Sequence, residues 1–260
     1  FTGSEGSIGL MTQATFAVRP AKTLPSARLF EFENLSAAIG SLSQLSFHQN
    51  TPYHVALLDS LALNLFGIEV SGTKHFLLVA LDDEDPEKRT NIEKSHDTAL
   101  TNLSKTLDSA HAEQTWKSMQ TGLGLAKSQN LILTEEVRIP MPVLSHALEL
   151  VTKISQKSSV DLALCAHAMS SQDCLLTALF KLHDKNDLET MKRFEITAAE
   201  IRETLVGEQG LPYGMGLVNL GILDWKFPFQ ASLMRTLKKR LDPLGILNPG
   251  KIFGNPPSGG

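Results

Sequence analysis

Hydrophobic and polar positions in the first half of the chain alternate in short segments that predict both strands and helices. Asn34 stands before an amphipathic segment, residues 35–47, and is a suitable N-cap for a helix there. Asp59 is expected to cap a helical turn, and a polar, charge-rich helix is expected over about residues 86–126. Strands are predicted at residues 14–19, 26–32, 54–58 and 75–81.

The second half of the chain repeats this order of elements. Its patterns predict helices over residues 143–156 and 187–205, and strands at residues 131–139, 160–166 and 174–180. The order strand, helix, strand, strand, helix is the beginning of a ferredoxin-like unit. We therefore predict an α+β fold in which two ferredoxin-like units stand side by side, with an antiparallel sheet and helices on one face.

The C-terminal stretch differs from both halves. Residues 230–241 predict an amphipathic helix, and the basic residues near its end suit the helix dipole. Asp-Pro-Leu-Gly at residues 242–245 stops this helix, and Ile-Leu-Asn-Pro-Gly-Lys follows at residues 246–251. Clusters of proline and glycine usually mark only a helix stop and a turn, so spacing alone assigns no function here.

Composition narrows the class of protein. The chain has 260 residues, of which 42% are hydrophobic and 20% charged, so it can bury a core and is not generally disordered. A net charge of −4 with interspersed signs argues against a nucleic-acid partner, and the apolar runs are too short for a transmembrane segment. With only Cys165 and Cys174, no disulfide framework is expected, which favours a reducing, cytoplasmic location. Peripheral attachment to a membrane through a partner stays open.

Three segments carry a resemblance to a known family. Residues 233–251, residues 3–12 and residues 136–140 resemble, in family order, segments of the FAD-linked oxidases of the vanillyl-alcohol oxidase superfamily. Glycolate oxidase and D-lactate dehydrogenase are the most similar types. The resemblance implies that residues 1–20 end an FAD-binding domain and that residues 21–253 form the C-terminal cap domain, a duplicated ferredoxin-like fold. Residues 254–260 are expected to be a tail.

The resemblance also implies a cofactor. FAD is expected in the full-length protein, with most of its contacts upstream of Phe1, so the 260-residue chain alone should hold FAD weakly or not at all and be inactive. The residues implied to contact the cofactor are Gly3, Ser4, Glu5, Gly6, Gly9, Asn248 and Lys251. An alternative stays open for each segment. Glycine-rich stretches usually form only a turn, and an Asn that precedes a proline, as Asn248 does, often serves only as a cap.

Family positions that bind a substrate carboxylate are altered. The family has an Arg three residues after a Trp, whereas Met119 follows Trp116 here; Leu123 and Thr134 replace two further polar or basic positions. Neither Met nor Thr offers the charge-assisted fork that a carboxylate needs. A 2-hydroxy acid is therefore only one candidate for the small-molecule substrate.

The family's metal and base positions are partly kept. His167 and Glu208 are retained and are the candidate catalytic residues, whereas Cys174 and Gln209 replace two family histidines. His167, Cys174 and Glu208 could together hold zinc, but we predict no metal, because Cys174 lies in an apolar strand segment. A lone histidine such as His167 is also often a structural residue.

Two functions from different classes follow. The first is the substrate-side cap of an FAD-dependent oxidoreductase that oxidises a 2-hydroxy acid, or another substrate, by hydride transfer to FAD. The second is a non-catalytic homologous subunit, an assembly partner of an active relative. The altered positions favour the second function, and the retained glycine-rich and C-terminal segments favour the first.

Overall fold

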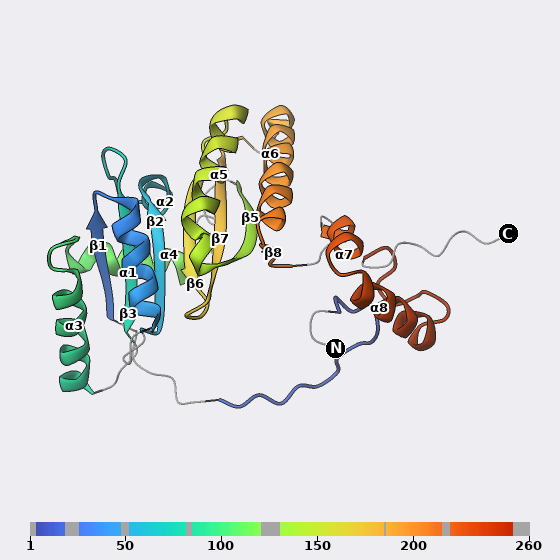
Figure 1. The fold of residues 1–260 in the computed structure, drawn as a ribbon. Helices are drawn as coiled ribbons and strands as arrows, with labels where there is room; N and C mark the ends of the chain where they lie inside the picture. Colours follow the sequence, from blue (N-terminus) through green and yellow to red (C-terminus); the bar gives the residue numbers. More distant parts are fainter. Residues whose placement is uncertain are drawn as a thin grey trace. The chain divides into compact units, whose positions relative to one another are not determined.

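The computed structural model describes residues 4–18, 26–47, 52–81, 85–120, 131–184, 186–214 and 219–251. The chain divides into two compact units. The sheet unit is Ala21–Leu211, and the end unit combines Phe1–Pro20 with Pro212–Gly260, so that both ends of the chain belong to one unit (Figure 1).

One eight-stranded sheet dominates the sheet unit, and its strands follow the order β4-β1-β3-β2-β6-β7-β5-β8. The order β4-β1-β3-β2 of the first half is therefore repeated, from the other edge, as β8-β5-β7-β6. The halves meet where β2 pairs antiparallel with β6 and Ala56 lies opposite His167. The strands are β1 (Ser26–Phe32), β2 (His54–Asp59), β3 (His75–Leu81), β4 (Lys105–Thr106), β5 (Leu131–Pro140), β6 (Ala163–Ala168), β7 (Asp173–Leu182) and β8 (Leu211–Pro212).

Helices accompany both halves of the sheet. A short 3-10 helix, Met141–Val143, leads into α5, and α7 and α8 lie in the end unit. No helix among the described residues is long and apolar enough to cross a membrane. The helices are α1 (Leu35–Phe47), α2 (Ser60–Leu65), α3 (Pro86–Leu100), α4 (Ser109–Gln120), α5 (Leu144–Ser158), α6 (Leu188–Gly207), α7 (Leu220–Lys226) and α8 (Pro228–Leu241).

The predicted α+β class with an antiparallel sheet is confirmed, and so are the two predicted caps. The Asn34 Oδ1 accepts a hydrogen bond from the Ala37 backbone N–H at 3.2 Å. The Asp59 Oδ1 accepts one from the Ala62 N–H at 2.7 Å. Such caps satisfy backbone donors that the first helical turn leaves unpaired.

Helices cover both faces of the sheet, so the prediction that they lie on one face is wrong. The first core lies between the sheet and α1, α3, α5 and α6, and Figure 1 shows α1 and α5 side by side over that face. The second core lies under α2 and α4. Strand β3 shows the cause: Leu77 and Val79 enter the first core, whereas Phe76 and Leu78 enter the second. A strand that is apolar on both sides needs cover on both faces.

Two predicted elements differ from the structure. Residues 14–18 are irregular and exposed rather than a strand, and the Phe16 side chain is 78% exposed. The reason is that an alternating segment without a pairing partner forms no stable strand. Arg19 lies outside the described residues. The long polar helix is two helices, α3 and α4, with β4 between them. Asp108 accepts a hydrogen bond from the His111 N–H at 3.0 Å and so begins α4 anew. Residues 121–126 lie outside the described residues.

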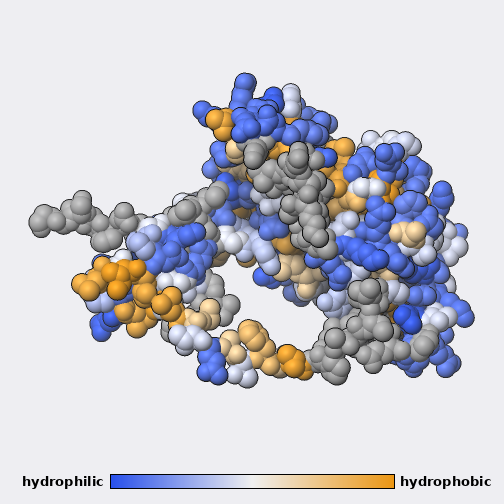
Figure 2. All heavy atoms as spheres, turned by 180° about the vertical axis from the view of Figure 1, so that it is seen from behind, coloured by the Kyte–Doolittle hydropathy of each residue, from blue (hydrophilic) through white to orange (hydrophobic). Residues whose placement is uncertain are grey.

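The end unit has a helix with a long apolar stripe. In α8, Phe229, Leu233, Leu237 and Leu241 follow one another at intervals of four residues, and all four are exposed. Figure 2 shows hydrophobic atoms gathered on this unit. The four-residue spacing places these side chains on one side of the helix.

Candidate functional site

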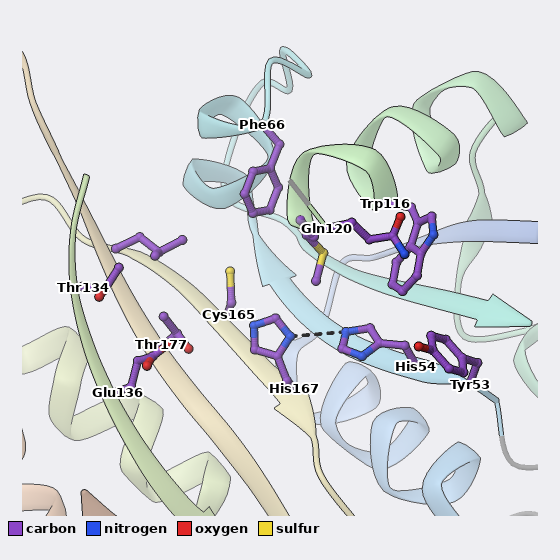
Figure 3. A pocket seen from close by; sticks show the side chains of 12 residues that line it. Tyr53, His54, Phe66, Trp116, Gln120, Thr134, Glu136, Cys165, His167 and Thr177 are labelled. Carbon is purple, nitrogen blue, oxygen red and sulfur yellow. Dashed lines mark hydrogen bonds between the residues drawn. The ribbon is translucent and has the colours of Figure 1, made fainter. Parts of the chain in front are cut away.

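A cavity of about 770 Å³ lies on the sheet face that carries α2 and α4 (Figure 3). Strands from both halves of the sheet form its floor, and α4 forms a wall. Its size is typical of a small-molecule site. The lining residues are Tyr53, His54, Phe66, Trp116, Met119, Gln120, Thr134, Glu136, Cys165, His167, Thr177 and Leu179.

Strand periodicity explains why these residues share the cavity. Successive side chains of a strand point to opposite faces, so residues two apart point the same way. Cys165 and His167 are two apart in β6, and Thr134 and Glu136 are two apart in β5. Each pair therefore reaches the cavity together, and the same rule applies to the lining pair of β7.

Two histidines from the two halves of the sheet meet in the cavity. The Nδ1 of His167 lies 3.3 Å from the Nε2 of His54, a hydrogen-bond distance at which one ring must donate and the other accept (Figure 3). Burial, and then the neighbouring His54 ring, lower the pKa of His167 from 6.5 to about 4. Burial also lowers the pKa of His54. Both rings are therefore uncharged at neutral pH.

Aromatic side chains hold the His54 ring in place. The centroid of Trp116 lies 5.4 Å from that of His54, and Tyr53 meets Trp116 edge to face at 6.1 Å. Aromatic rings at these separations attract one another beyond the burial of their surface. The His54 ring thus lies between the rings of Trp116 and His167, and this position directs its Nε2 toward the Nδ1 of His167.

Three positions singled out from the sequence line this cavity. His167 lies on its floor, and Met119 and Thr134 also line it. Among the described lining residues there is no Lys or Arg. Leu123, which the resemblance also singled out, lies outside the described residues.

Glu208 and Gln209 do not line the cavity. Glu208 follows the end of α6, and its Oε2 lies 3.8 Å from the Nε2 of His146 on α5. Both side chains of that pair are about half exposed. Gln209 has a left-handed backbone with φ of 72° and is exposed. The structure thus does not bring the two candidate catalytic residues, His167 and Glu208, into one cavity.

Cys174 lies on the opposite face of the sheet from His167. It is buried in the first core, and its thiol contacts the Ile139 carbonyl oxygen at 3.5 Å. Burial, and then the Asp173 charge, raise the pKa of this thiol to about 12. A protonated thiol across the sheet cannot share a metal ion with His167. In the part of the chain that the structure describes, no three His, Cys, Asp or Glu residues gather as a metal site.

The predicted cofactor segments meet in the end unit. The Asn248 side-chain amide donates a hydrogen bond to the Glu5 carbonyl oxygen, and Glu5 and Gly6 both have a left-handed backbone. Ser4 is buried beside this turn, whereas Gly3 lies outside the described residues. The Lys251 N–H lies 3.4 Å from the Asn248 carbonyl oxygen. The ends of the chain thus form one small structure.

A lysine of α8 holds this structure together. The Lys238 Nζ donates to the Ser7 carbonyl oxygen at 2.8 Å and to the Leu247 carbonyl oxygen at 2.6 Å. It also pairs with Asp242 at 2.5 Å. The Asp242 carboxylate also accepts hydrogen bonds from the N–H groups of Ile246 and Leu247. The bond with Lys238, and then these two backbone bonds, lower the pKa of Asp242.

Sequence reasoning missed His54 and Glu136. Both belong to predicted strands, but no sequence pattern tells which strand lies beside which. His54 and His167 are 113 positions apart and meet only because β2 pairs with β6. A histidine at the start of an otherwise apolar strand was the only available signal.

Known proteins resemble the chain over nearly its whole length. The family model of FAD linked oxidases, C-terminal domain, matches residues 26–252. The glycolate oxidase subunit GlcD of Bacillus subtilis (strain 168) is 25% identical, and the match covers 97% of this chain and 56% of the relative. The D-lactate dehydrogenase of Archaeoglobus fulgidus is 23% identical, with 96% of this chain and 56% of the relative covered.

A solved structure shares the fold. The 4-ethylphenol oxidase from Gulosibacter chungangensis matches 92% of this chain and 55% of its own chain, with a TM-score of 0.72 and 13% identity. The chain spans about half the length of the relatives that it matches. The family model covers most of the residues, in agreement with the resemblance found in the sequence. The chain belongs to the family of FAD linked oxidases, C-terminal domain.

Proposed function

We propose that this chain is the substrate-side half of an FAD-dependent oxidoreductase and that its cavity holds the group to be oxidised. The observation that carries this proposal is the position of His167 on the floor of a 770 Å³ cavity. A neutral imidazole has one bare ring nitrogen that can accept a proton, whereas the other candidate catalytic residue, Glu208, lies outside the cavity lining. We therefore assign proton transfer to His167 and not to Glu208.

Oxidation of an alcohol removes a proton from oxygen and a hydride from carbon. FAD, when bound, supplies the acceptor for the hydride. In this chain, the free ring nitrogen of His167 takes the hydroxyl proton, and His54 holds the ring through its other nitrogen. The bulky apolar residues Phe66, Met119 and Leu179 exclude water from the reacting carbon.

The end unit offers the contacts for the cofactor. Ser4, Glu5, Gly6, Gly9, Asn248 and Lys251 are the described residues that we propose to touch FAD. The bond from Asn248 to the Glu5 carbonyl supports this proposal, because it joins the two segments that the family resemblance implicated. The left-handed turn at Glu5 and Gly6 fits a close approach of backbone to a ligand. The remaining FAD contacts are proposed to lie on polypeptide beyond these 260 residues.

A second candidate is a non-catalytic homologous subunit that assembles with an active relative. It is favoured by Met119 and Thr134, which leave the described cavity lining without a cation, and by the separation of Glu208 from His167. In this case the cavity would be a remnant, and the end unit would serve assembly.

Flavin content separates the two candidates. We would purify the full-length polypeptide that contains this chain and record the visible absorbance of flavin, before and after adding a panel of alcohols without oxygen. Bound flavin that is bleached by an alcohol supports the oxidoreductase. A colourless protein that co-purifies with a flavin-containing relative supports the subunit. His167→Gln should lower the rate of bleaching by about 100- to 10,000-fold, the usual contribution of a general base.

A further inference from the structure

The cavity has an unusual charge balance for a protein whose relatives act on acids. Its described ionisable lining groups are Tyr53, His54, Glu136, Cys165 and His167, and none of them is a lysine or arginine. Burial raises the pKa of the Cys165 thiol well above its usual value, and both histidines are uncharged at neutral pH. Glu136 is the one carboxyl group of the described lining, and burial raises its pKa. The described lining therefore offers no positive charge at neutral pH.

A carboxylate ligand would meet unfavourable surroundings here. Burying an unpaired carboxylate costs several kcal/mol of solvation, and no described lining residue offers a cation to offset that cost. Thr134 and Met119 line the cavity, and neither can carry a positive charge.

The histidine pair suits a hydroxyl group better than a carboxylate. Each neutral ring has one N–H and one bare nitrogen, and one N–H is shared between His54 and His167. Depending on which ring donates, the outer nitrogen of His167 offers either a donor or an acceptor. A hydroxyl matches both states, because it donates and accepts, whereas a carboxylate can only accept. Figure 3 shows this outer nitrogen on the Cys165 side of the ring, away from His54.

Two further features complete the match. The Thr177 hydroxyl is buried at the floor and has no hydrogen-bond partner among the described residues. Buried polar groups are rarely left unpaired, so this hydroxyl is available to a ligand. Phe66, Trp116 and Leu179 give the rest of the lining an apolar character that suits a ring or hydrocarbon frame.

We propose that the cavity binds an uncharged ligand that carries a hydroxyl group on an aromatic or hydrocarbon frame, with the hydroxyl at the His54–His167 pair, and that it rejects carboxylates. This inference rests on the proposed function, because it names the substrate class of the same cavity. It concerns binding to the 260-residue chain and needs no flavin.

Benzyl alcohol and mandelate are a matched pair of probes, because mandelate is benzyl alcohol with a carboxylate on the carbinol carbon. We would titrate the 260-residue chain with each probe and follow the ring signals of His54 and His167 by NMR. Benzyl alcohol should shift both rings, and mandelate should bind at least about tenfold more weakly, the effect of one unpaired buried charge. Mandelate binding as tightly as benzyl alcohol, or no shift with either probe, would overturn the proposal.

A charge-adding variant tests the cause of the selectivity. Thr134→Lys places a cation in the lining and should strengthen mandelate binding at least about tenfold, while benzyl alcohol binding stays within about twofold. Gln44→Lys adds the same charge to the exposed surface of α1, beside the other core, and should change neither affinity. If both variants affect mandelate equally, the local argument is wrong. A colourless full-length protein would refute the oxidoreductase but leave these binding results standing.

Discussion

His167 makes the stability of the fold depend on pH in a defined direction. Its pKa in the fold is about 4, below the usual value of 6.5, so the folded state disfavours the charged ring. A group with a lowered pKa contributes stability that is present above its unfolded pKa and lost as pH falls. Between pH 6.5 and pH 4 the chain should therefore lose up to about 3 kcal/mol through this residue.

Urea unfolding of the chain and of His167→Gln, measured across that window, isolates the contribution. Asp59 acts with the opposite sign, because burial raises its pKa to about 6 and its contribution fades as pH rises. Only the difference between the two proteins therefore reports on His167. His146→Gln, at a half-exposed histidine, is the matched control and should track the unchanged chain. Parallel curves for the chain and His167→Gln would contradict the prediction.

Arg202 and Glu135 form a buried ion pair between α6 and β5, with 2.8 Å between Nη1 and Oε2. Both side chains are less than one-tenth exposed. Arg202→Met leaves a buried carboxyl without its partner and should lower the free energy of unfolding by about 3–5 kcal/mol. The double variant Arg202→Met with Glu135→Leu should recover most of this loss. A double variant no more stable than the single one would show that the arginine acts by packing.

At the level of single residues, the sequence singled out His167 but not its neighbour His54. The catalytic role of His167 stays a prediction. The family resemblance pointed to His167, and the structure places it in the cavity. Glu208 came from an equally good motif match, yet it lies near His146 outside the lining. A motif gives residue types in order along the chain. It does not give the distance between residues that the fold brings together.

At the level of elements, Asp59 links the two halves of the sheet. Its Oδ1 caps α2, and its Oδ2 accepts a hydrogen bond from the Leu164 N–H of the other half at 2.9 Å. Asp59→Ala should cost about 2–3 kcal/mol, because a cap and a buried backbone partner are lost together. Asn34→Ala removes a single exposed cap from α1 and should cost about 1 kcal/mol or less.

Chemical denaturation of the two variants under the same buffer gives the comparison. Asp59→Asn keeps one acceptor oxygen and should lie between the unchanged chain and Asp59→Ala. Equal losses for Asp59→Ala and Asn34→Ala would mean that the bond to Leu164 contributes nothing.

Element boundaries were predictable wherever one pattern dominated. The ranges for β1, β3 and α1 agree with the structure to the residue, because clear apolar periods and a cap bounded them. The split between α3 and α4 was missed, because a uniformly polar stretch offers no periodic signal at the break. The sequence also did not predict that α2 and α4 cover the second face of the sheet, because both helices offer few apolar positions. α2 is short, and α4 buries only a few residues, Ala112, Thr115 and Trp116.

At the level of the whole molecule, the substrate preference can be tested against that of the relatives. We expect the full-length protein not to oxidise D-lactate or glycolate at a kcat near 10 per second, about the median for enzymes. Each missing charge-assisted pair to the carboxylate costs about 2–5 kcal/mol. Met119 and Thr134 line the cavity without a charge, and the described lining holds no Lys or Arg. A steady-state assay with an artificial electron acceptor measures this. Turnover of D-lactate at that rate would show that other residues recognise the acid.

Adding cations to the cavity lining tests the same prediction in the opposite direction. Met119→Arg combined with Thr134→Lys should raise kcat/KM for D-lactate, whereas adding Gln209→His should add little, because Gln209 does not line the cavity. A large further gain from Gln209→His would show that this residue reaches the substrate.

The overall class and the repeated order of elements were predictable, because they follow from local patterns. The mirrored strand order of the two halves agrees with that repetition, and their ferredoxin-like character stays a prediction. The cavity was not predictable, because it forms between halves that are distant in sequence. Its position depends on the pairing of β2 with β6.

That pairing also bears on cooperativity. The β2–β6 ladder is short, with three residue pairs, Ala56 with His167, Leu57 with Ala166 and Leu58 with Cys165. His54 comes from one half and His167 from the other, so a ligand held by both rings binds only while the ladder is intact. By mass action such a ligand opposes separation of the halves as well as unfolding of either one. Occupancy of the cavity would then merge two partly independent melting units into a single transition.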